Sequence, residues 1–100
     1  MSQLKSDDYP AFFKDYIYSV SRPVMEELKE QLRSFPTFMQ QIPEERGLFR
    51  YAEDKWTIKE VLGHILDAER VMAYRALRFA RNDMTALESF EQDEFVANGR

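Results

Sequence analysis

The only histidine of the chain, His64, lies among acidic side chains at helical spacing. Glu60 precedes it by four residues and Asp67 follows it by three, offsets at which side chains meet along an α-helix. An imidazole beside two carboxylates can bind a divalent metal, but it equally describes a hydrogen-bonded histidine next to a packed helix face. Metal-binding motifs usually contain several such ligands, so a lone histidine favours the second interpretation. Both interpretations stay open on the residues alone.

Two more side chains of the same stretch are candidates for chemistry. Glu69 falls in the middle of the apolar side of the expected helix, where a carboxylate has to be paired, hydrogen-bonded or close to water. A buried pair is the simpler interpretation and a catalytic role the alternative, because Glu is seldom buried without a partner. Arg75 lies nearer His64 than the other arginines and is a candidate for an anion contact or an ion pair. The remaining arginines indicate a solvated face rather than a phosphate-binding stripe: Arg70, Arg78 and Arg81.

The helix that positions these residues is the clearest element of the sequence. Thr57 is expected to cap it, with Glu60 three residues later completing a capping box. The helix is expected to run about 25 residues to Arg81, with Asn82 as its stop. Its apolar residues fall on one side, which we expect to face a core. This apolar stripe comprises Ile58, Val61, Leu62, Ile65, Met72, Ala73, Ala76 and Ala80, with Leu66 and Leu77 at its margin.

Helical periodicity also dominates the rest of the chain. Residues 21–35 predict a second amphipathic helix that begins at Ser21 and Pro23, and Pro36 is expected to stop or kink it before one further turn. An aromatic-rich opening, residues 7–20, predicts a short docking helix, and another short helix is expected around 88–96. No stretch alternates with a period of two, so the fold class is predicted to be all-α.

Composition excludes several classes of function. The chain has 100 residues and no cysteine, so a thiolate metal site and a cysteine nucleophile are both excluded. A net charge of −4 argues against nucleic acid as a partner. The start of the chain lacks the pattern of a signal peptide, and no window is apolar enough to cross a membrane. We therefore expect a cytoplasmic protein with no membrane partner.

The stretch KWTIKEVLGHILDAERVMAYRALRFARND closely resembles the signature helix of the DinB-like superfamily of small bacterial four-helix-bundle proteins. The segments AFFKDYIYSV, FRYAEDKW and MTALESFEQDEFVANGR fit the same family. The resemblance implies an up-and-down bundle with a long crossover after its second helix. It also implies a divalent metal, such as Zn, Ni or Fe, held by three histidines: one on the second helix, which His64 matches, and an H-x-x-x-H pair on the fourth.

Relatives in this superfamily include thiol-dependent transferases and isomerases. The resemblance therefore implies a divalent-metal-dependent hydrolase or transferase that acts on a small-molecule or thiol substrate, the metal activating a water or a thiol. This chain departs from the pattern because it contains no second histidine and hence no H-x-x-x-H pair. Glu60, Asp67 and Glu69 are then candidates for supporting or substitute ligands beside His64.

We expect residues 1–100 to form a single, partial DinB-like domain, the N-terminal half of the bundle, with Arg100 falling where a third helix would begin. Two helices with one apolar side each cannot bury those sides well. Completion by missing C-terminal helices or by a homodimer is therefore expected, since a two-fold dimer would rebuild four helices. The alternative to an enzyme is a non-catalytic helical interaction module that self-associates.

Overall fold

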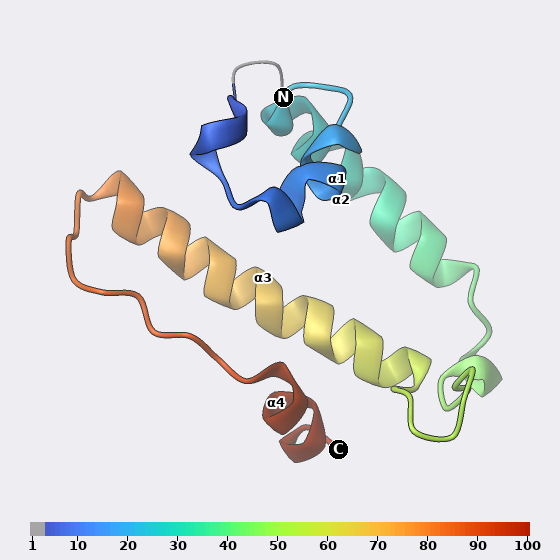
Figure 1. Ribbon diagram of the computed structural model, residues 1–100. Coiled ribbons are helices and arrows are strands. Elements are labelled where there is room, and N and C mark those ends of the chain that lie inside the picture. The colour runs from blue at the N-terminus through green and yellow to red at the C-terminus, as the bar shows by residue number, and fades with distance from the viewer. Residues whose placement is uncertain (1–3) are drawn as a thin grey trace. The chain divides into compact units, whose positions relative to one another are not determined.

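The computed structural model describes residues 4–100, and this part of the chain contains helices and no strand (Figure 1). Met1–Gln3, at the start of the stretch expected not to be a signal peptide, lie outside the described residues. The prediction of an all-α fold is confirmed. The α-helices are α1 (Lys14–Tyr18), α2 (Val24–Gln40), α3 (Ile58–Ala80) and α4 (Gln92–Asn98), and the 3₁₀ helices are η1 (Ser6–Asp8), η2 (Ala11–Phe13) and η3 (Glu44–Arg46).

The chain divides into two compact units, Met1–Ile42 and Pro43–Arg100, which are described one at a time. The expected single domain over residues 1–100 stays a prediction. None of the helices in residues 4–100 combines the length and the apolar character that a membrane span requires.

In the first unit, α2 continues through Pro36 as one helix and ends at Gln40, so the expected stop at Pro36 is wrong. A proline inside a helix removes one backbone donor and crowds the carbonyl four residues earlier. Just after it, the Thr37 hydroxyl donates a hydrogen bond of 2.9 Å to the Arg33 carbonyl. The helix begins after Pro23, whose extended backbone occupies the N-cap position, so the hydroxyl of Ser21 is not the cap.

In the second unit, both ends of α3 follow the sequence. The Thr57 hydroxyl accepts a hydrogen bond from the Glu60 N–H at 3.1 Å, and the Thr57 N–H donates to the Glu60 carboxylate at 3.0 Å, which confirms the capping box. At the other end Asn82 has a positive φ of 53°. The N–H groups of Asn82 and Asp83 each donate at 3.0 Å to carbonyls of the last turn, the arrangement of a Schellman C-cap.

The N-cap of α3 gives the first prediction. Thr57 is 3% exposed, and its hydroxyl satisfies an N–H of the first turn that has no partner within the helix. Thr57→Ala should therefore lower the free energy of unfolding by about 1 kcal/mol, whereas Thr57→Ser, which keeps the hydroxyl, should lower it much less. Urea unfolding followed by circular dichroism measures both. Equal losses for the two variants would show that the hydroxyl is not what stabilises this end.

After α3 the chain turns and runs back beside the helix, ending in α4 (Figure 1). Arg75 donates a hydrogen bond of 2.6 Å to the Glu88 carbonyl, and Arg78 donates to the Thr85 carbonyl and pairs with Asp83 at 2.7 Å. Val96 of α4 is 6% exposed, the only apolar side chain in residues 4–100 that counts as fully buried. The returning segment is therefore attached to α3 mainly through arginines, with one apolar anchor near its end.

The returning segment covers the side of α3 opposite to the apolar stripe. His64, Asp67, Arg75 and Arg78 are half-buried beneath it. The stripe remains open, with exposed fractions of 43% for Val61, 40% for Ile65 and 53% for Met72 in the list of exposed apolar residues. The expectation that the stripe faces a core is therefore not met within residues 4–100, because the chain that returns along α3 packs on its polar side.

Candidate functional site

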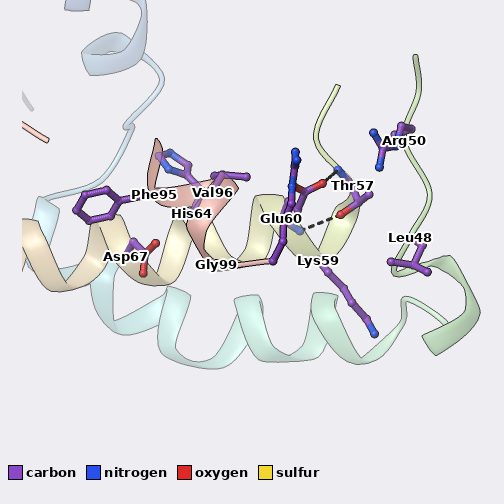
Figure 2. A pocket seen from close by; sticks show the side chains of 12 residues that line it. Leu48, Arg50, Thr57, Lys59, Glu60, His64, Asp67, Phe95, Val96 and Gly99 are labelled. Atoms are coloured by element: carbon purple, nitrogen blue, oxygen red, sulfur yellow. Dashed lines mark hydrogen bonds and ion pairs between the residues drawn. The ribbon is translucent and has the colours of Figure 1, made fainter. Parts of the chain in front are cut away.

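A cleft of about 510 Å³ lies where α4 meets the first half of α3 and the segment that precedes it (Figure 2). Figure 2 shows Thr57, Glu60, His64 and Asp67 following one another along α3, with Val96 close by on α4. The walls are mostly apolar, but several charged groups reach them. The lining residues are Leu48, Arg50, Thr57, Lys59, Glu60, Gly63, His64, Asp67, Phe95, Val96, Gly99 and Arg100.

Glu60 closes one end of the cleft with both of its carboxylate oxygens engaged. Oε1 accepts the Thr57 N–H at 3.0 Å, and Oε2 accepts the Arg100 guanidinium at 2.6 Å. These contacts favour the ionised form, so the Thr57 backbone N–H first and the Arg100 side chain second lower the pKa of Glu60 to about 2. Glu60 is therefore an ionised structural carboxylate that ties the end of the chain to the start of α3.

This ion pair makes the second unit sensitive to acid. A carboxyl whose pKa is lower in the folded chain stabilises the fold above its unfolded pKa, and that contribution is lost as the pH falls toward the folded value. For Glu60 the loss should extend from about pH 4.5 down to about pH 2. Urea unfolding of the wild type and Glu60→Gln at a series of pH values should show a stability difference at pH 6 that vanishes near pH 2. A difference independent of pH would contradict the assignment.

His64 sits deeper in the same cleft. Its ring packs against Trp56 with centroids 5.1 Å apart and planes inclined by 45°. Its Nδ1 atom is buried and has no hydrogen-bond partner among the described residues. Asp67, one turn further along α3, lines the cleft as well and lies 4.0 Å from the Arg70 guanidinium. The histidine therefore presents one nitrogen to a largely apolar space rather than serving as a hydrogen-bonded core residue.

The described residues do not by themselves fit a complete metal centre. A tetrahedral protein site uses three or four donors, and Glu60 is committed to Thr57 and Arg100. His64 and Asp67 are then the remaining donors in the cleft. Accordingly, no group of three His, Cys, Asp or Glu side chains within residues 4–100 is arranged to hold a metal ion.

The other two candidate residues lie outside the cleft. Glu69 is exposed on α3, so the partner expected for a buried carboxylate is not required there. The Arg75 guanidinium donates to the Glu88 carbonyl, so it holds the returning segment of chain rather than facing His64 across a pocket. Whether either residue has a functional role stays a prediction.

Sequence reasoning missed the residues that reach the cleft from far along the chain. Arg100 pairs with Glu60 across 40 residues, and Val96 and Phe95 arrive on α4. Periodicity along one helix carries no signal for such contacts. Trp56 was the exception in principle, because a large ring directly before the N-cap is placed to pack on the first turns of the helix.

These features define a small all-α protein built on a long, capped amphipathic helix with a histidine cleft on its polar side. The family model of the DinB superfamily matches residues 27–96, which include α3 and nearly all of α2. The chain belongs to the DinB superfamily, whose fold is a helical bundle and whose members are generally associated with metal. Neither the curated proteins nor the solved structures gave a match to the chain.

Proposed function

We propose that this DinB-superfamily chain acts as a helical self-association module, in which two copies pack through the apolar stripes of their α3 helices. One observation carries the proposal: α3 has an apolar stripe over its whole length, and the second unit covers only the opposite side. Leu66 and Leu77 at the margin of the stripe are 49% and 48% exposed. A contiguous apolar surface of this kind favours association in water, because packing removes it from solvent.

The first unit supports the same function independently. α2 also carries large apolar side chains that are exposed, among them Met25 at 61%, Leu28 at 51% and Leu32 at 79%. These residues recur at spacings of three and four and so share one side of the helix. Two copies together supply four long helices, an α2 and an α3 from each, which is the number that a four-helix bundle needs.

The test is the mass of the native protein in solution. Light scattering on purified protein should give about twice the chain mass of 11.9 kDa, with a helical circular dichroism spectrum. A folded, stable monomer over the accessible concentration range would overturn the proposal.

A second candidate function, a divalent-metal-dependent hydrolase or transferase, is favoured by one observation at His64. Its buried Nδ1 atom lacks a hydrogen-bond partner in the described chain, and a buried nitrogen left in this way is costly unless something binds it. His64 would be one ligand of the metal and Asp67 a second, while the rest would have to come from groups outside the described cleft. A small-molecule or thiol substrate would then enter between α3 and α4.

Metal binding separates this candidate from a module without catalysis. Equilibrium dialysis against Zn²⁺ or Ni²⁺ should give stoichiometric binding that is lost in His64→Ala and kept in a matched control, Tyr74→Ala, on α3 outside the cleft. Equal metal content in wild type and His64→Ala would contradict the metal site. Because dialysis reports on binding alone, the result does not depend on knowing the reaction.

A further inference from the structure

The two halves of α3 differ in the size of the side chains that they contribute to the apolar stripe. The first half carries the bulky Ile58, Leu62 and Ile65, whereas the second half carries alanine at 73, 76 and 80. If two such helices paired in parallel, bulky residues would meet at one end and alanines at the other. One end would be crowded and the other poorly filled, and both conditions are unfavourable for packing.

Charge is divided along α3 in the same way. Residues 58–69 contain three carboxylates and one lysine, whereas residues 70–81 contain four arginines and no carboxylate. Parallel pairing would bring the four arginines of each copy to the same end. Antiparallel pairing would place the acidic half of each helix beside the basic half of the other, and it would also oppose the two helix dipoles.

From these two gradients we infer that α3 pairs with α3 of a second copy in an antiparallel orientation, about a two-fold axis beside Glu69. The inference rests on the self-association proposed above and assigns its geometry. Glu69 is the midpoint of α3, so an axis there gives the longest overlap of the two stripes. Ile58 then faces Ala80 of the second copy, and Leu62 faces Ala76, so that each bulky side chain meets a small one.

Glu69 is the one charged residue within the stripe, and the axis explains how it is tolerated. Each Glu69 would lie close to its own copy across the axis, and two bare carboxylates there would repel each other. Arg70 follows directly on the flank of the same helix and is 80% exposed on its side chain, free to reach across. Two Glu69 and two Arg70 side chains together form a neutral cluster, and such polar groups in an apolar seam fix register.

Cysteine cross-linking tests the orientation without interference, because the chain contains no cysteine. The variants Leu62→Cys and Ala76→Cys are purified separately, mixed, allowed to exchange subunits and oxidised mildly. Antiparallel pairing predicts a disulfide dimer that contains one chain of each variant, identified by its mass, at least about tenfold in excess over either homodimer. Tyr74→Cys, on the side of α3 away from the stripe, is the matched control and should not cross-link when oxidised alone.

The outcomes separate the orientation from the association itself. Cross-linking of Leu62→Cys to itself would show parallel pairing and overturn this inference, while leaving the dimer intact. A dimer by light scattering that forms none of these disulfides would show that another surface pairs, and this also overturns the inference. A monomer would overturn the self-association on which the inference rests.

Discussion

Replacing Ile65 by aspartate is expected to turn the dimer into a monomer, weakening self-association by at least about a hundredfold. Ile65 lies on the apolar stripe and is 40% exposed in the single chain, so the substitution burdens the chain itself little. In a dimer packed through the stripe, the same position would be buried, and an unpaired carboxylate there is costly because it loses its water without gaining a partner.

The measurement is sedimentation equilibrium of wild type and Ile65→Asp at matched concentrations, with circular dichroism to show that the variant keeps its helices. Tyr74→Asp is the control, since Tyr74 is 58% exposed but lies outside the stripe, with the Arg78 guanidinium 5.7 Å from its ring. It should dimerise as the wild type does. Equal weakening by both substitutions would show that charge alone, rather than the stripe, governs association.

Replacing Val96 by aspartate is expected to release α4 from α3. Val96 is the only fully buried apolar side chain within residues 4–100, and the tail is otherwise held by arginine contacts and the pair of Arg100 with Glu60. A buried, unpaired carboxylate in its place should cost about 3 kcal/mol or more, which exceeds what exposed ion pairs supply. The cleft around His64 would then open.

Hydrogen exchange of peptides that cover 92–98 should detect this release as a loss of protection, while peptides from the middle of α3 keep theirs. Met84→Asp is the matched control, because Met84 lies in the same returning segment but is 86% exposed. It should leave the exchange of α4 unchanged. Retained protection of α4 in Val96→Asp would show that other contacts dock the tail.

The parts of the fold that depend on neighbouring residues were predictable from the sequence. The capping box at Thr57 and the stop at Asn82 are both confirmed, because each involves a few residues within one turn. The path through Pro36 was not predictable, since the cost of a proline inside a helix is set against the packing of the whole helix. The presence of a short C-terminal helix was anticipated, although it begins at Gln92 rather than near residue 88.

The candidate site was only half predictable, for a physical reason. Helical spacing placed Glu60, His64 and Asp67 on one side of α3, and all three do line the cleft. Spacing could not show that Arg100 would occupy one oxygen of Glu60, because that contact spans 40 residues. It also could not show which side of α3 the tail would cover. The stripe was expected in a core, whereas the structure leaves it open, and the proposed association follows from this difference.

The most direct test of the central claim is hydrogen exchange of α3 as a function of protein concentration. If two copies pack through the stripe, peptides from 58–80 should gain protection as concentration rises through the dimerisation range, while peptides from α4 should not change. Protection of α3 that stays the same from dilute to concentrated protein would contradict the claim that this helix is where the chain associates.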